Sequence, residues 1–166
     1  KDAGFETSFE FLHRVQFSEE GIFDANDNRF EYWFKLFPWE NIGFEEPNLV
    51  ALLNQIYKKN RAIILNPPYT LLFQSKGILK ILYDLFPNSP YLLKTDFKPL
   101  KNIKQVEKKM FGREGANTKI YDENGNCIKK TDGEYENYKS IFQEYYEFPQ
   151  DEFGNSYQAG VFFAFE

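Results

Sequence analysis

The stretch Val106–Asn117 holds the residues whose types and spacing could do chemistry. It reads VEKKMFGREGAN, in which two glycines, Gly112 and Gly115, follow a pair of lysines. Glycine lets backbone N–H groups turn toward an anion without a Cβ in the way, and Lys108 and Arg113 supply positive charge. The stretch therefore has two interpretations: a flap that covers the phosphates of a nucleotide, or an ordinary surface loop with solvated charges. Residue types alone favour the ordinary loop.

A β-hairpin is predicted to position these glycines. Residues Thr118–Tyr121 alternate in character, the turn sequence DENGN follows, and a second short strand begins at Cys127. Asparagine followed by glycine is typical of a type I′ turn, so we expect this turn at Asn124–Gly125. The glycines of Val106–Asn117 then lie at one end of a hairpin and not at the start of a helix.

Two further places could serve the same chemistry. Lys76 lies in the first turn of a helix predicted over Ser75–Phe86, where the helix dipole disfavours a cation by a few tenths to about 1 kcal/mol. Either this side chain points into water, or it and the helix N–H groups bind one anion together. In the predicted strand Ser140–Phe148, polar Gln143 and Glu144 interrupt a largely apolar and aromatic sequence.

The remaining elements complete a mixed α/β (α+β) chain. Helices are expected where apolar residues repeat every three or four positions, and strands where they alternate or form short runs. The order lacks the regular βαβ alternation of a doubly wound sheet, and neither GxxxxGK[ST] nor GxGxxG occurs, so P-loop and Rossmann folds have no support. The other expected elements are a helix from Pro47 to Asn60 and strands at Ser8–Val15, Arg29–Phe37, Ala62–Leu65, Tyr91–Phe97 and Tyr157–Phe165.

Composition and charge exclude some classes of function. The chain has 166 residues, with 25 acidic and 20 basic side chains and a formal charge of −5, so we expect no nucleic-acid partner. No segment has the length and apolar continuity of a membrane span. A single cysteine, Cys127, suits a reducing compartment, so the expected location is cytoplasmic. The only histidine, His13, is assigned no role, and the aromatic residues are expected to fill the core.

The ends of the chain suggest part of a longer protein. The sequence begins at Lys1 without a methionine and stops at Gly160–Phe165, an apolar run. Such a run needs a neighbouring strand. We therefore expect an internal or C-terminal fragment.

Four stretches in a fixed order resemble a known family. The series FKLFPWE, then SKGILKILYDLFPNSPYLL, then KKMFGREGAN, then FQEYYEFP is similar to the glutathionylspermidine synthase family of ATP-grasp carbon–nitrogen ligases. The resemblance covers most of residues 30–166 and implies a partial ATP-grasp fold, with mixed and antiparallel sheets, flanking helices and a glycine-rich hairpin flap. It divides the chain into a core-lobe portion at residues 1–70, a nucleotide lid lobe with the flap at 71–142, and a linking strand with a return to the core at 143–166.

The resemblance also implies which residues bind ATP. Lys76 and Lys108 match the two lysines that contact the nucleotide. The glycine-rich loop that closes over the triphosphate matches Gly112, Arg113, Glu114, Gly115, Ala116 and Asn117. The strand whose backbone groups hydrogen-bond adenine matches Gln143, Glu144 and Tyr145. No catalytic or metal-binding residue is assigned, because in this family the residues that bind Mg²⁺ and the reacting carboxyl lie upstream of residue 1.

The implied reaction is ATP-dependent amide formation. A small peptide carboxylate would be phosphorylated by ATP to an acyl phosphate, which an amine then attacks; the fragment by itself is not expected to turn over. Asn66–Tyr69 replaces the family's usual Glu-Pro-x-Trp, and Lys109 replaces a proline, so the identity of the acid and the amine stays open. Two alternatives are an ATP-binding or regulatory module without ligase activity, and a structural interaction domain.

Overall fold

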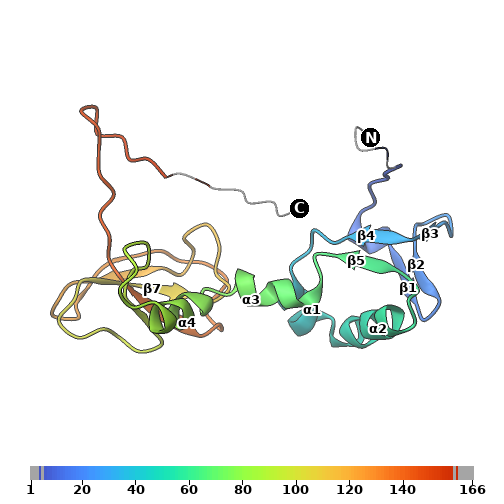
Figure 1. Cartoon of the computed structure of the whole chain (residues 1–166), viewed down its shortest axis with the longest axis horizontal. Coiled ribbons are helices and arrows are strands. Elements are labelled where there is room, and N and C mark those ends of the chain that lie inside the picture. Colours follow the sequence, from blue (N-terminus) through green and yellow to red (C-terminus); the bar gives the residue numbers. More distant parts are fainter. Residues whose placement is uncertain (1–3, 5, 159, 161–166) are drawn as a thin grey trace. The chain divides into compact units, whose positions relative to one another are not determined.

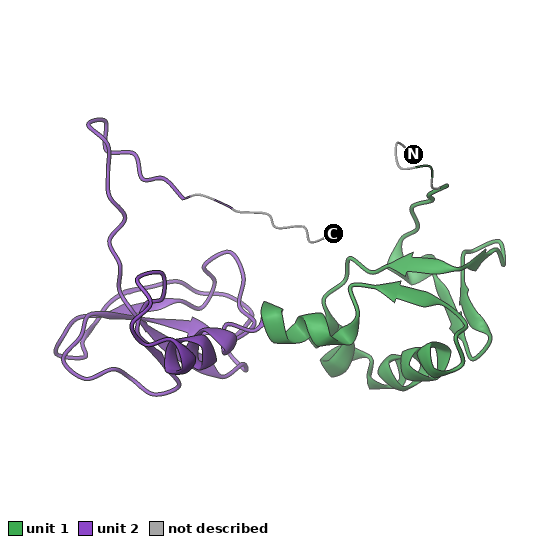
Figure 2. Cartoon of the chain, in the orientation of Figure 1, with its two compact units in different colours: residues 1–74 green, residues 75–166 purple. Residues whose placement is uncertain are grey.

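The computed structural model describes residue 4, residues 6–158 and residue 160. The chain forms two compact units, Lys1–Gln74 and Ser75–Glu166, which Figure 2 colours separately. Both units combine helices with small sheets, so the predicted mixed α/β class is confirmed (Figure 1).

Unit 1 holds two sheets and most of the helices. An antiparallel sheet has the order β1-β2-β3, and a two-stranded sheet pairs β4 with β5 in parallel. The strands are β1 (Gln16–Ser18), β2 (Gly21–Phe23), β3 (Arg29–Phe30), β4 (Tyr32–Phe34) and β5 (Ile63–Leu65). The helices are α1 (Trp39–Glu45), α2 (Pro47–Lys58) and α3 (Leu71–Gln74), with 3-10 turns at Leu12–Arg14 and Pro68–Thr70.

Helix α2 follows directly from local sequence. Pro47 occupies the first helical position, where its missing N–H costs nothing, and Lys58 lies in the last turn, where the helix dipole favours a cation. The helix ends where Asn60 adopts a left-handed conformation with φ of 52°. Its apolar stripe packs into the core of unit 1, which consists of Ile22, Trp39, Ile42, Leu53, Ile56, Ala62 and Ile64.

Unit 2 is built on one antiparallel sheet of five strands. Its order is β6-β10-β7-β8-β9, so β7 lies in the middle with β10 and β8 as its neighbours. The strands are β6 (Thr95–Asp96), β7 (Gln105–Lys109), β8 (Lys119–Tyr121), β9 (Cys127–Lys130) and β10 (Ser140–Glu144), and the single α-helix described in this unit is α4 (Ile78–Leu85). The glycine stretch connects β7 to β8, which confirms that it lies at one end of a hairpin.

The hairpin turn between β8 and β9 differs from the predicted type I′ turn. A type I′ turn needs a positive φ at both central residues, but only Gly125 has one, at 86°, and Asn124 does not. The Asp122 carboxylate instead accepts hydrogen bonds from the backbone N–H groups of Asn124 and Asn126, at 3.0 and 2.7 Å. The type I′ prediction was therefore wrong, because the aspartate that begins the turn organises it.

The same turn recurs twice in the chain. Asp24 and Asp151 also open five-residue turns that end in asparagine, and each carboxylate accepts the N–H groups two and four residues later. The fourth residue is left-handed every time: Asp27 at φ 63°, Gly125 at 86° and Gly154 at 80°. The pattern Asp-x-x-(Gly or Asp)-Asn is thus one local solution that this chain uses repeatedly.

Other predicted elements need correction. The predicted strand Ser8–Val15 is absent from the described residues, which contain only a 3-10 turn there; Phe9 and Phe11 contact each other and are exposed. The predicted strand Arg29–Phe37 is broken after Phe30 into β3 and β4, which join different sheets. The predicted strand Tyr157–Phe165 lies mostly outside the described residues.

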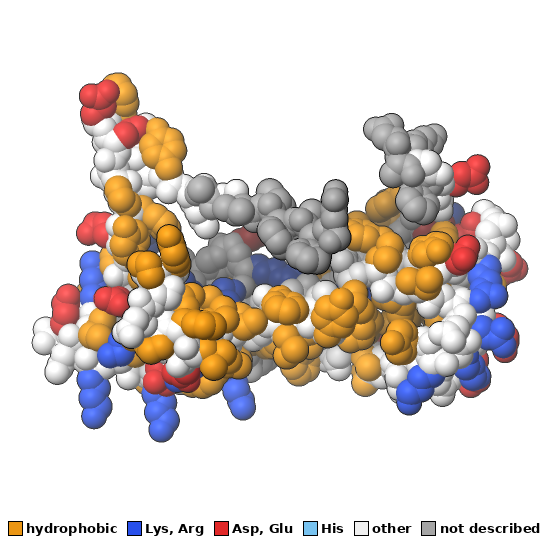
Figure 3. All heavy atoms as spheres, viewed as in Figure 1, with side chains coloured by type: hydrophobic (Ala, Val, Ile, Leu, Met, Phe, Trp, Pro, Cys, Tyr) orange, Lys and Arg blue, Asp and Glu red, His pale blue; other side chains and the backbone are white. Residues whose placement is uncertain are grey.

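The expectation that aromatic side chains fill the core was also wrong in part. Trp39 is buried, but the other fully buried apolar residues among those described are aliphatic or alanine. Hydrophobic side chains are prominent on the surface in view (Figure 3). One example is the outer face of the β4–β5 sheet, where Phe34 and Ile63 are 58 % and 52 % exposed.

Candidate functional site

All the residues predicted to contact the nucleotide lie in unit 2. Lys76 precedes α4, Lys108 lies on β7, and the glycine loop follows β7 directly. Gln143 and Glu144 end strand β10, which pairs with β7. The fold therefore brings the segment before α4 and the two central strands of the sheet to the same region.

Lys76 is bound to the glycine loop. Its backbone N–H donates to the Met110 carbonyl at 2.8 Å, and its ammonium group donates to the Gly112 carbonyl. The helix begins only at Ile78, so Lys76 lies before the first turn and not within it as the sequence predicted. Burial lowers the pKa of Lys76, and the positive charge of Arg113 lowers it further.

Lys108 is held by the neighbouring strand. Its ammonium group donates a 2.8 Å hydrogen bond to the side-chain oxygen Oε1 of Gln143 on β10. Burial lowers the pKa of Lys108, and the charge of Lys76 lowers it further. Two partly buried ammonium groups thus lie close enough to repel each other, and an anion placed between them would relieve this repulsion.

The glycine loop is a tight structure with a left-handed tip. Glu114, Gly115 and Asn117 have φ values of 52°, 73° and 49°. The Ala116 N–H donates to the Arg113 carbonyl at 2.9 Å, which closes the turn. Left-handed residues turn successive N–H groups toward one side, the arrangement that forms anion-binding concavities. Its backbone conformation is therefore compatible with a phosphate.

A polar segment, Thr131–Lys139, supports this loop from the side; we call it the brace. The Met110 N–H donates to the Lys139 carbonyl at 2.8 Å, and the Thr131 hydroxyl donates to the Gly115 carbonyl at 2.5 Å. No sequence pattern connects this segment with the loop. The only signal is Gly133, where a side chain would collide with Ala116.

Asn117 is the main contact between the loop and the brace. It is buried, its side-chain oxygen accepts the Tyr135 N–H at 2.8 Å, and its side-chain nitrogen donates to the Glu136 carboxylate at 3.2 Å. Both ends of the amide are occupied within the protein. In this conformation Asn117 supports the loop, while Arg113, Glu114 and Gly115 are the exposed members.

The end of β10 offers a different set of groups from those predicted. The backbone N–H groups of Glu144 and Tyr145 donate to the carbonyls of Lys94 and Lys104, at 2.8 and 2.9 Å. The Lys104 ammonium lies 4.1 Å from the centre of the Tyr145 ring. These two N–H groups are therefore already used, and contacts with adenine in this conformation would have to come from other atoms of the strand.

A buried carboxylate lies on the other face of the central strand. Glu107 accepts hydrogen bonds from the Ser140 and Tyr121 hydroxyls, both at 2.7 Å. Burial acts to raise the pKa of Glu107, but these two bonds and the charges of Lys119 and Lys109 outweigh it, so the pKa is lowered. Burial and the bond to Glu107 raise the pKa of Tyr121 to about 12. This cluster was not predicted from the sequence, although alternate positions on β7 must face opposite sides of the sheet.

The part of the chain that the structure describes contains no group of three or more histidine, cysteine, aspartate or glutamate side chains that could hold a metal ion. No helix among the described residues has both the length and the apolar character needed to cross a bilayer.

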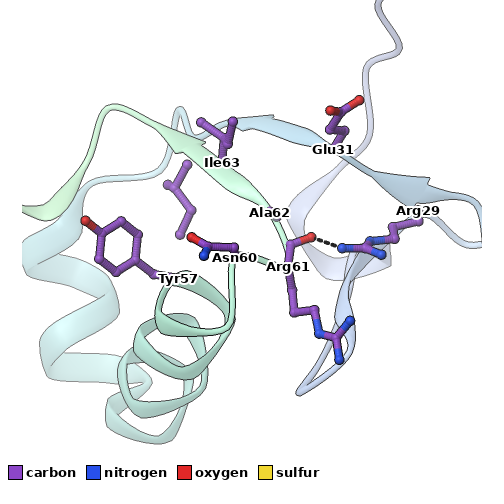
Figure 4. A pocket seen from close by; sticks show the side chains of 8 residues that line it. Arg29, Glu31, Tyr57, Asn60, Arg61, Ala62 and Ile63 are labelled. Carbon is purple, nitrogen blue, oxygen red and sulfur yellow. Dashed lines mark hydrogen bonds between the residues drawn. The ribbon is translucent and has the colours of Figure 1, made fainter.

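A pocket of about 550 Å³ lies in unit 1, whereas the predicted nucleotide residues belong to unit 2. It is formed between the end of α2 and strand β5, and its lining includes Tyr57, Asn60 and Ile63 (Figure 4). The Arg29 guanidinium at one end donates to the Arg61 carbonyl, so this charged group is used within the protein. No role is assigned to this pocket.

Comparison with known proteins identifies the family. A family model described as "Glutathionylspermidine synthase preATP-grasp" matches residues 1–166. The chain belongs to this family. The resemblance inferred from the sequence is therefore confirmed, and the mixed α/β structure is a partial ATP-grasp fold.

Two relatives agree with this family. A Haemophilus influenzae protein described as "Putative acid--amine ligase" is 30 % identical over 135 residues, which cover 76 % of this chain and 33 % of that protein. The Escherichia coli bifunctional glutathionylspermidine synthetase/amidase is 30 % identical over 106 residues, which cover 62 % of this chain and 17 % of that protein. The chain thus spans about a third of the length of the first relative and about a sixth of the second. The family points to an acid–amine ligase similar to glutathionylspermidine synthase.

Proposed function

We propose that unit 2 is the part of an ATP-dependent acid–amine ligase that holds the nucleotide. The observation that supports this most strongly is a pair of partly buried ammonium groups from separate elements. Lys76 donates to the Gly112 carbonyl of the glycine loop, and burial together with the charge of Lys76 lowers the pKa of Lys108. Burying two like charges is costly without an anion to neutralise them. A triphosphate between these lysines and the loop would supply that anion.

ATP binding would replace contacts that the protein now makes with itself. The Lys76 ammonium, now on the Gly112 carbonyl, would turn to a phosphate oxygen, while Lys108 would contact the nucleotide from its position beside Gln143. Arg113, Glu114, Gly115 and Ala116 would close over the triphosphate with Gly112, and Asn117 would hold the loop on the brace. The strand end Gln143–Tyr145 would contact adenine. The task of these groups is positioning and charge stabilisation of the phosphoryl group in transfer.

The reaction proposed for the complete protein has two steps. A carboxylate oxygen of a small peptide attacks the terminal phosphorus of ATP, forming an acyl phosphate and releasing ADP. The nitrogen of an amine then attacks the acyl carbon, loses a proton, and expels inorganic phosphate, which leaves an amide. A closed glycine loop would exclude water and so protect the acyl phosphate from hydrolysis. As the resemblance implies, we propose that Mg²⁺ takes part in this reaction and that its ligands come from elsewhere in the protein.

We also propose a structural role for each of three segments of the chain. We assign residues 1–70 to a core-lobe portion, 71–142 to the lid lobe with the flap, and 143–166 to the linking strand and the return to the core. Because the chain spans about a third of one ligase relative, we propose that it works as part of a longer protein and does not turn over by itself. Which acid and which amine are joined follows from residues that the site in unit 2 does not include.

Binding of Mg-ATP to the complete protein tests the nucleotide site. Saturating ligand at 100 times its Kd should stabilise the protein by about 2.7 kcal/mol, which a thermal shift assay detects. Lys108→Ala and Lys76→Ala should each weaken binding at least about tenfold, since each removes a charged partner of a phosphate. Lys129→Ala is the matched control, because Lys129 is an exposed lysine on β9. A complete wild-type protein without any shift, or equal binding by its Lys108→Ala and Lys129→Ala variants, would contradict the nucleotide site.

Ligase activity needs a separate test with the complete gene product. ADP release would be measured with thiol peptides crossed with polyamines and amino acids. Amine-dependent ADP release supports the ligase. Mg-ATP binding without any such release would favour an ATP-binding or regulatory module, and absence of both would favour a structural interaction domain.

A further inference from the structure

Three polar side chains form a chain of hydrogen bonds across the sheet of unit 2. Lys108 on β7 donates to Gln143 on β10 at 2.8 Å, and the Gln143 side-chain nitrogen donates to the Thr95 hydroxyl on β6 at 3.1 Å. The Thr95 hydroxyl in turn donates to the Leu93 carbonyl at 2.9 Å. The sequence places Lys108 and Gln143 in the predicted nucleotide site, but it assigns no role to Thr95.

Strand register explains why these residues meet. Gln143 is paired directly with Thr95 on one side and with Val106 on the other, so all three face the same side of the sheet. Lys108 lies two residues beyond Val106 on β7 and therefore faces that side as well. Thr95 is 1 % exposed and Gln143 is 7 % exposed, so water cannot replace either partner.

The direction of each hydrogen bond is determined by chemistry. An ammonium group can only donate, so Gln143 must turn its oxygen toward Lys108. Its NH₂ group then faces Thr95, which must accept, and the Thr95 hydrogen is left to donate to Leu93. With the amide turned over, an NH₂ group would face an ammonium group and a carbonyl would face the hydroxyl. The Thr95 hydroxyl could donate to that carbonyl, but it would then lose its hydrogen bond to the Leu93 carbonyl.

We propose that Thr95 is a positioning residue for the nucleotide site, because it fixes the orientation of the Gln143 amide and thereby holds the Lys108 ammonium where it can contact a phosphate. This proposal rests on the proposed function of Lys108. Thr95 itself contacts neither the loop nor Lys108 in the hydrogen bonds described, and acts through Gln143.

The test compares Thr95→Val, which removes the hydroxyl at nearly constant shape, with Thr95→Ser, which keeps it. The first readout needs no nucleotide: the rate at which Lys108 is acetylated by limiting acetic anhydride, measured by mass spectrometry against exposed Lys101. Thr95→Val should raise this rate several-fold, because a released or reversed amide leaves the ammonium less stabilised and more accessible. Thr95→Ser should match the wild type.

Buried Lys109 on the same strand controls for unfolding. Its acetylation rate should stay constant in Thr95→Val if the sheet remains folded, because Lys109 faces the opposite side and contacts the brace. If Lys109 also becomes reactive, Gln143→Leu provides the second variant, in which the amide is removed and Thr95 keeps its bond to Leu93. It should release Lys108 in the same way.

The second readout is the Kd for Mg-ATP, measured by calorimetry on the same variants of the complete protein. Thr95→Val should bind about tenfold more weakly than the wild type, with Thr95→Ser restoring most of the affinity. Unchanged Lys108 reactivity in Thr95→Val with an intact Lys109 signal overturns the positioning role, whether or not ATP binds. A complete wild-type protein that does not bind Mg-ATP overturns the nucleotide site, while the labelling result still decides whether Thr95 orients Lys108.

Discussion

Replacing Gly133 with alanine should destabilise the glycine loop, although Gly133 lies in the brace and not in the loop. A Cβ built at Gly133 would lie 2.5 Å from the Ala116 Cβ, 2.7 Å from the Asn117 Oδ1 and 3.3 Å from the Ala116 Cα. Ordinary contact begins at 3.4 Å, so loop and brace must separate by about 1 Å to admit one methyl group.

Neither neighbour can move away cheaply. The Ala116 Cβ is attached directly to the loop backbone, and the Asn117 amide is held by Tyr135 and Glu136. Inserting a methyl group into such a contact costs about 1–3 kcal/mol, and losing the Asn117 bond to the Tyr135 N–H adds about 1 kcal/mol. The loss of stability should be confined to unit 2, because both sides of the contact belong to that unit.

The two units need separate probes, since a chain with two units is not a safe two-state system. The only tryptophans, Trp33 and Trp39, lie in unit 1, so tryptophan fluorescence in urea follows that unit alone. Hydrogen exchange of the β7 and β8 amides, measured by mass spectrometry, follows unit 2. Gly133→Ala should speed exchange in β7 and β8 and leave the fluorescence midpoint unchanged.

Gly43→Ala is the matched control. Gly43 lies in α1, and apart from its two chain neighbours and the backbone of the helix itself, no described atom lies within 4 Å of the point that a Cβ would occupy there. Alanine at this position should therefore stabilise unit 1 by about 0.5–1 kcal/mol and leave β7 and β8 unaffected. Adding Ala116→Gly to Gly133→Ala removes one of the two shortest contacts and should restore part of the protection. Unchanged exchange of β7 and β8 in Gly133→Ala would show that the brace does not support the loop.

Two further predictions concern the turns and the lysines. Asp27→Gly should increase the unfolding free energy of unit 1 by up to about 1 kcal/mol and so raise the urea midpoint of its fluorescence. The reason is that Asp27 takes the left-handed conformation that Gly125 takes in the matching turn. A loss of stability would contradict this. Mg-ATP affinity should fall as pH rises toward the ordinary lysine pKa of 10.5. In the free protein, the pKa values of Lys76 and Lys108 are lowered, so these lysines lose their protons at a lower pH than ordinary lysines do. Bound phosphates would raise both pKa values, so binding is favoured where the lysines are protonated. Calorimetry in buffers of different ionisation enthalpy should then show proton uptake on binding, and affinity that increases with pH would refute the assignment.

Elements with strong local signals were predictable. Helix α2 agrees with its prediction because an N-terminal proline, a regular apolar stripe and a left-handed asparagine all act within a few residues. Strand β5 and the β8–β9 hairpin also follow from short apolar runs and turn residues. Local signals failed where a side chain decided the backbone, as Asp122 does in the hairpin turn, and where Arg29–Phe37 divides between two sheets.

The sequence by itself determined the family and the charged residues of the candidate site. A nucleotide-binding ligase family was indicated by the order of Lys76, Lys108, the glycine loop and Gln143–Tyr145. The family model confirms that family. Whether these residues contact a nucleotide stays a prediction.

Only the tertiary structure decided how these residues are held. Lys76 contacts the carbonyl of Gly112, Asn117 faces the brace, and Lys108 is held by Gln143, which Thr95 holds in turn. Each contact joins residues far apart in sequence, and those of Lys108, Gln143 and Thr95 depend on strand register. A shift of one residue would turn every side chain of a strand to the opposite face. No local pattern encodes that choice, which is why the glycine loop was visible in the sequence and its supports were not.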